Sequence, residues 1–304
     1  MYRFLFSVLA LATLSAPAGA AAKLRVAAPL PGLAAIAREV GGSGTDVFSF
    51  SSPQQDPHFV DPRPDLVVRL NRAELLVLNG LDLEVGWLPP LLTASRNAKL
   101  SPGGPGYLDA STLVQTREVP AGRVDRAQGD VHPGGNPHFL YDPRQAAKVA
   151  RGVGERMAAL DPTGATGYRS RAADLAERLE ALAGEEADRF RALSPEARRV
   201  VVYHRSFPYL EAWLGLERVA EVEPKPGVSP DPAHVAQVLG TMRARQVRAI
   251  LQEDFYPAAT PQTLARLAAA RLVVLPAAPR FAEGEQIAAW HRRLAGEVYR
   301  ALAP

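Results

Sequence analysis

The sequence predicts an α/β protein of two lobes, each with a mostly parallel sheet flanked by helices, joined by one long linker helix. Short apolar runs alternate with amphipathic stretches along both halves of the chain, which is typical of parallel strands and crossover helices. Between the halves, apolar residues recur at steps of four and three over about thirty residues, as on one face of a long helix. The length of 304 residues is that of about two domains.

The first 22 residues have the layout of a secretory signal peptide. Arg3 supplies a positive charge, Phe4–Leu14 is an apolar run, and Ala18–Ala20 offers small residues for cleavage. The run of 11 residues is shorter than the ~20 that a membrane-spanning helix needs. We therefore expect cleavage near Ala20–Ala22, export to the periplasm, and no membrane span in the mature chain.

Residues 23–160 are expected to form the N-terminal lobe. The stretch Asn97–Pro137 is rich in glycine and proline and has no long apolar period, so we expect mostly loop there. The predicted strands are Leu24–Ala28, Val47–Phe50 and Leu75–Leu78, and the predicted helices are Leu33–Val40, Pro64–Arg72 and Pro143–Leu160.

Residues 161–195 are expected to form the linker helix. Asp161 is a good N-cap, Pro162 suits the first helical position, and Ser194-Pro195 ends the pattern. At 1.5 Å per residue such a helix is roughly 45 Å long, which suits a spine between two lobes better than a core element. The apolar face consists of Tyr168, Ala172, Leu175, Leu179 and Leu182.

Residues 196–304 repeat the rhythm and are expected to form the C-terminal lobe. The strands are predicted at Val200–Tyr203, Val247–Leu251 and Leu272–Leu275. The helices are predicted at Pro208–Leu214, Pro232–Arg245, Pro261–Ala270 and Ile287–Leu302.

Composition excludes several classes of function. The charge of +3, from 35 basic and 32 acidic residues, is too small and scattered for a nucleic-acid partner. The absence of cysteine excludes disulfides, thiolate metal sites and cysteine nucleophiles, and we expect no cysteine-linked lipid anchor. Any metal bound here is held by nitrogen and oxygen.

Three of the six histidines lie where ligands of open α/β sheets are usually found. His58 and His204 follow predicted strands in opposite halves of the chain, and His138 lies just before a predicted helix. Imidazole nitrogen suits Zn²⁺ and its neighbours, and three imidazoles leave one tetrahedral position for a carboxylate or water. On position alone, metal ligands and ordinary surface or capping residues are equally good interpretations.

The other histidines are weaker candidates. We expect His234, at a polar helix start, to be exposed to solvent, and the neighbouring Arg292 and Arg293 to disfavour a cation at His291. His132 is interpreted as a loop histidine, with an auxiliary ligand role left open.

Four segments of the sequence resemble the solute-binding proteins of ABC importers for zinc and manganese. They carry a first histidine followed by an apolar strand ending in Asn-Gly, a Gly-Asn-Pro-His segment, a histidine at a strand end, and a Glu-Pro-Lys-Pro-Gly turn. The resemblance covers nearly the whole mature chain. The segments are DPHFVDPRPDLVVRLNRAELLVLNGLDLEVGWL (56–88), GDVHPGGNPHFLYDP (129–143), VVYHRSFPYL (201–210) and EPKPGVSP (223–230).

The resemblance implies that Zn²⁺ is held between the lobes by His58, His138 and His204 and delivered to a membrane permease. A histidine rather than a glutamate at position 204 resembles the zinc-preferring members. The protein is then a carrier in the periplasm, a monomer, and not an enzyme; a metal-loading chaperone remains open as a further partner. If the linker helix ties the lobes together, domain closure on loading is small.

Two features depart from the family pattern. The residues after the last predicted strand, Leu275–Pro279, contain no carboxylate where the family often has a fourth ligand. We take Glu253, at the end of a neighbouring strand, as the candidate fourth ligand, with water as the alternative. Residues 109–137 contain one histidine, which argues against a metal-gathering loop. Asp56 and Glu223 are candidate acceptors for the far ring nitrogens of the ligands.

Two rival functions are kept. A secreted zinc hydrolase would use three histidines on the metal and Glu253 as general base, but the chain has no His-Glu-x-x-His or Gly-x-Ser-x-Gly motif. The same two-lobed scaffold could instead bind a small organic ligand. A manganese carrier is the alternative within the family.

Overall fold

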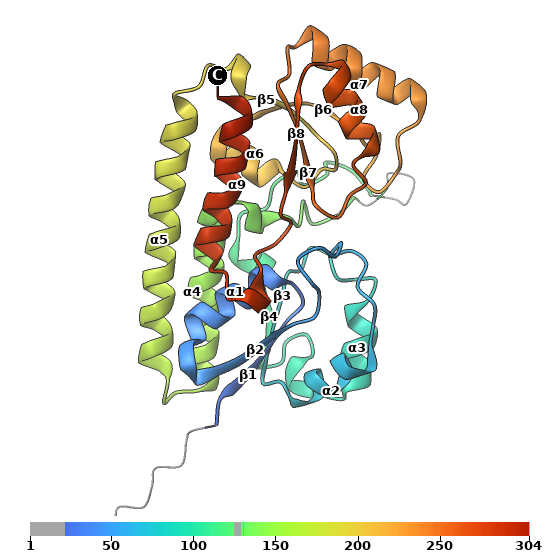
Figure 1. The fold of residues 1–304 in the computed structure, drawn as a ribbon. Coiled ribbons are helices and arrows are strands. Elements are labelled where there is room, and N and C mark those ends of the chain that lie inside the picture. Colours follow the sequence, from blue (N-terminus) through green and yellow to red (C-terminus); the bar gives the residue numbers. More distant parts are fainter. Residues whose placement is uncertain (1–21, 125–128, 130, 304) are drawn as a thin grey trace, which may run out of the picture.

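The computed structural model describes residues 22–124, 129 and 131–303. The predicted signal peptide lies outside these residues except for Ala22. The described residues form two parallel four-stranded sheets, one in each lobe, with the strand orders β2-β1-β3-β4 and β6-β5-β7-β8. The predicted fold class is therefore confirmed (Figure 1). In the described part of the chain, no helix has the length and apolar character of a membrane span.

The sheet of the N-terminal lobe separates two layers of helices. Alternate residues of β1 face opposite sides: Val26 joins the core beneath α1 and α4, and Ala27 joins the core beneath α2 and α3. The strands are β1 (Leu24–Ala28), β2 (Thr45–Ser49), β3 (Leu75–Leu78) and β4 (Tyr107–Asp109). The helices are α1 (Pro31–Gly41), α2 (Pro64–Arg72), α3 (Leu88–Ser95) and α4 (Pro143–Leu160).

The C-terminal lobe repeats this arrangement. Val201 of β5 packs into the core under α7 and α8, whereas Val200 and Val202 face α6 and α9. The strands are β5 (Arg199–Val202), β6 (Glu217–Glu221), β7 (Ala249–Glu253) and β8 (Arg271–Leu275). The helices are α6 (Pro208–Leu214), α7 (Pro232–Ala244), α8 (Ala259–Leu267) and α9 (Ile287–Leu302).

Helix α5 (Ala165–Arg191) runs along both lobes, with α4 beside it in one lobe and α9 in the other (Figure 1). Arg171 donates from Nε to the carbonyl of Val40 in the first lobe at 2.7 Å. Trp213 in the second lobe donates from Nε1 to the carbonyl of Ala183 at 3.0 Å. The helix is therefore fixed to both lobes by side-chain hydrogen bonds as well as by its apolar face.

The lobes also contact each other directly beside α5. Arg38 of α1 donates to the carbonyls of Phe281 at 2.6 Å and Glu285 at 2.9 Å. Glu39 accepts the backbone N–H of Ile287, the first residue of α9, at 2.8 Å. These bonds join the first helix of one lobe to the segment 281–287 of the other, which leads into α9.

Helix α3 (Leu88–Ser95) was not predicted, and three further elements differ from the sequence-based expectation. The linker helix begins at Ala165 because Asp161 caps a turn instead, accepting the N–H of Thr163 at 3.2 Å and of Gly164 at 3.3 Å. Strand β4 lies inside the stretch expected to be mostly loop, and β6 was not predicted. Both are edge strands, and β6 carries glutamate and arginine instead of a continuous apolar run.

We expect Phe190→Ala to lower the free energy of unfolding by about 3–5 kcal/mol. Phe190 lies near the end of α5, fully buried, with its ring 5.4 Å from that of Tyr299 in α9. Urea denaturation followed by circular dichroism measures the loss. Glu185→Ala, at an exposed position of the same helix, is the control and should stay within about 0.5 kcal/mol. A loss below about 1 kcal/mol for Phe190→Ala would contradict the role given to α5.

Candidate metal site

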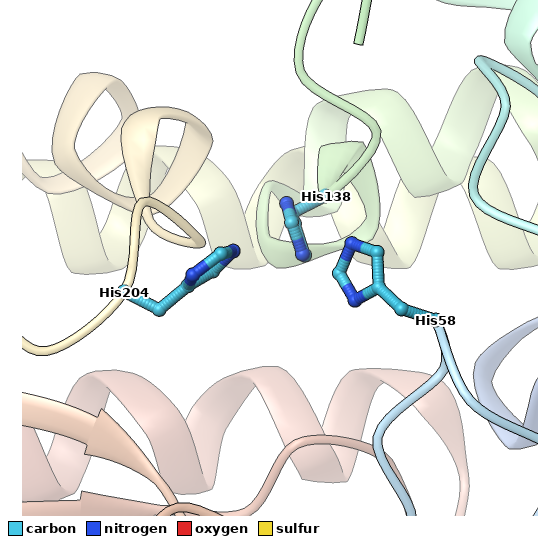
Figure 2. Close-up of side chains that lie close together, drawn as sticks. All are labelled: His58, His138 and His204. Carbon is cyan, nitrogen blue, oxygen red and sulfur yellow. The ribbon is translucent and has the colours of Figure 1, made fainter. Parts of the chain in front are cut away.

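Three histidines from separate parts of the chain meet between the lobes. One ring nitrogen from each of His58, His138 and His204 can be chosen so that all lie within 4.8 Å of one another. His58 lies in the loop after β2, and His204 lies after β5. His138 precedes the short turn Phe139–Tyr141, which leads into α4. Figure 2 shows the three rings pointing toward one another from different chain segments. His204 is the most enclosed, with 4% of its surface exposed.

Each of the three rings is oriented by an acceptor at Nδ1. Asp56 accepts from His58 at 2.8 Å, Asn136 from His138 at 3.0 Å, and Glu223 from His204 at 2.7 Å. An ionised carboxylate only accepts, so Nδ1 carries the proton in His58 and His204. Their Nε2 lone pairs are then free to bind a metal, and the acceptors fix the ring orientation. The candidate acceptors Asp56 and Glu223 thus lie where the sequence analysis expected them.

The amide of Asn136 plays the same part for His138. Its Nδ2 donates to the carbonyl of Arg205 at 2.7 Å, which leaves Oδ1 as the acceptor. Oδ1 receives both the backbone N–H and the Nδ1–H of His138, each at 3.0 Å. His138 therefore also presents Nε2 as a lone pair. The sequence analysis missed Asn136 as a functional residue.

Two identical local devices hold His58 and His138. In Asp56-Pro57-His58 and Asn136-Pro137-His138, the first side chain accepts the backbone N–H and the ring N–H of the histidine two residues later. The proline carbonyls are also bound, that of Pro57 by Trp87 at 3.0 Å and that of Pro137 by Asn79 at 2.9 Å. The repeated Asx-Pro-His pattern is visible in the sequence and was the signal that could have identified Asn136.

His204 is held by a turn of the C-terminal lobe. Glu223, in the Glu-Pro-Lys-Pro-Gly segment, accepts from His204 Nδ1 through Oε2, and the same oxygen accepts the N–H of Gly227 at 3.0 Å. Glu223 is itself buried. The turn after β6 therefore determines the orientation of a histidine that follows β5.

The electrostatics of the site favour a neutral imidazole at His138. Burial lowers the pKa of His138 well below its usual range, and the neighbouring His58, His204 and His132 lower it further. Burial acts to raise the pKa of Asp56, but hydrogen bonds and charge interaction with His58 outweigh it and the pKa is lowered. The site thus combines a neutral imidazole with an ionised carboxylate, which favours a bound cation.

Glu253 lies at the end of β7, only 1% exposed, outside the group of three histidines. Tyr141 donates its hydroxyl to Glu253 Oε1 at 3.4 Å, and burial raises the pKa of Glu253 to about 8. Glu253 and His138 line the same cavity of about 60 Å³, together with Ala277 from the segment after β8. Its assignment as the fourth ligand stays a prediction.

The remaining histidines have different environments. His132 Nε2 lies 3.3 Å from His58 Nε2, beside the group of three. His234 is half-buried rather than exposed, because its Nε2 donates to the carbonyl of Glu221 at 3.0 Å. His291 is fully buried, donates to the carbonyl of Leu140 at 2.7 Å, and has its pKa lowered to about 4 by burial.

The fold and the histidine cluster together define the class of the protein: a two-lobed binding protein with a candidate metal site between its lobes. The family model described as ZnuA, "Zinc-uptake complex component A periplasmic", matches residues 26–299, and the chain belongs to this family. This is a family of substrate-binding transport proteins. The resemblance drawn from the sequence motifs is thereby confirmed.

Individual relatives are distant in sequence. The manganese ABC transporter substrate-binding lipoprotein PsaA of Streptococcus mitis is 25% identical over 197 residues, which are 64% of this chain and 60% of that protein. The chain thus spans less than two thirds of that relative. The metal ABC transporter substrate-binding lipoprotein FimA of Streptococcus parasanguinis is 22% identical over 251 residues, 82% of this chain and 78% of that protein.

Solved structures share the fold. A crystal structure of ZnuA superposes with a TM-score of 0.77 at 20% identity and covers 92% of this chain and 100% of that chain. The binding protein FpvC of Pseudomonas aeruginosa, in complex with Mn²⁺, gives 0.70 at 21% identity, covering 92% and 97%. At such identities the likeness concerns the fold alone.

Proposed function

We propose that this protein binds Zn²⁺ between its lobes on the outer side of the inner membrane, in the periplasm, and delivers it to the permease of an ABC importer. The observation that carries the proposal is the convergence of three Nε2 lone pairs, each from a ring whose Nδ1 is bound by an acceptor. His58, His138 and His204 are the proposed ligands. Capture and transfer of an ion call for a closed shell, which one further ligand beside the three histidines would complete.

Zinc is proposed over manganese because of the donor atoms. Imidazole suits zinc, whereas manganese is better served by carboxylate, carbonyl and water oxygen. Manganese is the second candidate, since streptococcal relatives carry that metal in their names. The proposed partners are the permease and a metal-loading chaperone, and the proposed state in solution is a monomer.

The direct test is the metal content of protein purified without a histidine tag. We expect about one zinc per chain by plasma mass spectrometry, and tighter binding of zinc than of manganese in competition with a chromophoric chelator. Protein that holds no divalent metal, and takes none up from solution, would refute the proposal. Turnover of esters or peptides by the zinc-loaded protein would favour the rival hydrolase, which uses Glu253 as general base.

We expect zinc to leave the relative position of the lobes nearly unchanged. The bonds from Arg38 and Glu39 to the segment 281–287, together with α5, join the two lobes and oppose a hinge. Small-angle scattering of the metal-free and zinc-loaded protein should give superimposable curves. Crystal structures of the two states that differ by a large hinge rotation would contradict this expectation.

We expect Glu223→Gln to weaken zinc binding about 10–100-fold. The substitution keeps the size of the side chain but removes the negative charge that accepts from His204 Nδ1 at 2.7 Å. Chelator competition measures the affinity. The matched control is Glu221→Gln, which removes a carboxylate paired with Arg205 and not with a histidine of the cluster. Equal losses in the two variants would show that Glu223 acts only through general charge.

A further inference from the structure

His132 is the histidine next to the cluster whose role neither the fold nor the proposed function assigns. Its Nε2 lies 3.3 Å from His58 Nε2, and the two ring centroids are 5.5 Å apart with a tilt of 32° between the planes. It also contributes to lowering the pKa of His138. His132 is therefore close to two of the three proposed ligands.

The separation of the two nitrogens equals that of two ligands on one zinc ion. Ligand nitrogens at 2.0–2.1 Å from a tetrahedral zinc are about 3.3–3.4 Å apart. At this distance the two nitrogens share a hydrogen bond: Asp56 fixes the proton of His58 on Nδ1, so His132 Nε2–H is the donor. For Nε2 of His132 to bind a metal, the proton on Nε2 has to be replaced by one on Nδ1. Nε2 then carries the lone pair that a ligand needs.

We propose that His132 is the fourth ligand of the metal, so that the ion is held by four imidazoles. This inference rests on the proposed function, because it assigns the remaining position of the same site. It requires His132 to approach His138 and His204 more closely than it does here, since the group within 4.8 Å comprises His58, His138 and His204.

The loop that carries His132 allows such an approach while its base is fixed. At the base, the N–H of Asn136 bonds to the carbonyl of Arg117 at 2.8 Å, which leaves His138 in place. Within the loop, the carbonyl of His132 accepts the N–H of Gly135 at 3.1 Å. Gly135 has φ of +109°, and a Cβ there would lie 2.9 Å from the Arg117 carbonyl oxygen. The turn therefore depends on glycine at this position, and an approach of His132 to His138 and His204 has to come from rotation of its side chain.

The charge of the site does not need a carboxylate as fourth ligand. Asp56 and Glu223, bound to the Nδ1 atoms of His58 and His204, together carry two negative charges when ionised and balance a divalent cation. A fourth imidazole leaves this balance unchanged. The segment Pro276–Pro279 after β8 indeed offers no carboxylate.

The position of His132 also fits the path of the ion. His132 and His138 line a pocket of about 390 Å³ that includes Lys225 and Pro226 of the opposite lobe. Glu253 and His138 line a different, smaller cavity. His132 is thus on the more open side of the cluster, and its ligation would cover an ion already bound to the other three rings.

The test is X-ray absorption at the zinc edge of the full-length zinc-loaded protein, with zinc affinity by chelator competition, for the wild type and three variants. We expect four imidazoles in the wild type and three in His132→Ala, with a loss of affinity of about tenfold or more. Glu253→Gln and the control His234→Ala should keep four imidazoles. His234 is a half-buried histidine outside the cluster.

A wild-type spectrum with three imidazoles and one oxygen, unchanged in His132→Ala, would overturn the inference and leave the three-histidine carrier intact. If in addition Glu253→Gln weakens zinc binding about tenfold or more, Glu253 is the fourth ligand. If the wild type binds no zinc, the proposed function itself fails, so the two failures are distinguishable.

Discussion

His204→Ala should weaken zinc binding more than the loss of a hydrogen-bond partner behind a ligand does. Such a loss typically lowers metal affinity about 10–100-fold. Among the three proposed ligands, His204 is contributed by the C-terminal lobe and is the most enclosed, with 4% exposed. Its removal takes away a ligand and also leaves the buried Glu223 without the ring that donates to it at 2.7 Å. Both effects oppose binding of the ion between the lobes.

The affinity of His204→Ala is measured by competition with a zinc chelator, and circular dichroism verifies that the variant is folded. His234→Ala is the matched control because it removes a histidine of the same lobe that bonds to the carbonyl of Glu221. We expect the control to bind zinc as the wild type does. Wild-type affinity in His204→Ala would remove that residue from the site.

Zinc affinity should fall as the pH is lowered through the ordinary histidine range, near ~6.5, because imidazole binds metal only when neutral. The sign follows from proton competition: protons that the free protein gains at low pH have to leave when zinc binds. His138 has its pKa well below the usual range, so it remains neutral at a pH where an ordinary histidine is charged. Protonation of His138 therefore weakens zinc binding only at a lower pH.

Titrations with zinc between about pH 5 and pH 8 measure this dependence. We expect His138 to supply none of the protons released when zinc binds at about pH 6, because burial and the neighbouring histidines hold its pKa well below the usual range. Equal dissociation constants at the two ends of the range would rule out a shell of three histidines.

Most of the fold could be predicted because its central strands carry an unambiguous signal. Runs such as Leu75–Leu78 and Val200–Val202 are apolar throughout and lie buried in the middle of the sheets. An edge strand pairs with a neighbour on one side only, so its residues do not all have to be apolar. Tyr107–Asp109 and Glu217–Glu221 contain charged residues and could be recognised only from the strands they pair with.

The site could be predicted in part. The rule that ligands lie at the carboxyl ends of strands selected His58 and His204, and the structure brings both rings together with His138. The position of His132 could not be derived, because it depends on contacts distant in sequence. Tyr209 of α6 accepts the N–H of Arg117 at 3.0 Å and donates to the carbonyl of Asn136 at 2.8 Å. These bonds place the loop, and no local pattern encodes them.

The two Asx-Pro-His turns make the orientation of a ring independent of the length of the loop around it. In each turn, the acceptor and the histidine are two residues apart, so insertions or deletions elsewhere in the same loop leave the ring's hydrogen bonds intact. The orientation of each ring is therefore set within three residues, whereas the position of the turn is set by contacts from elsewhere in the fold. Placed in an unrelated protein, the same three residues would hold a histidine whose proton is fixed on Nδ1.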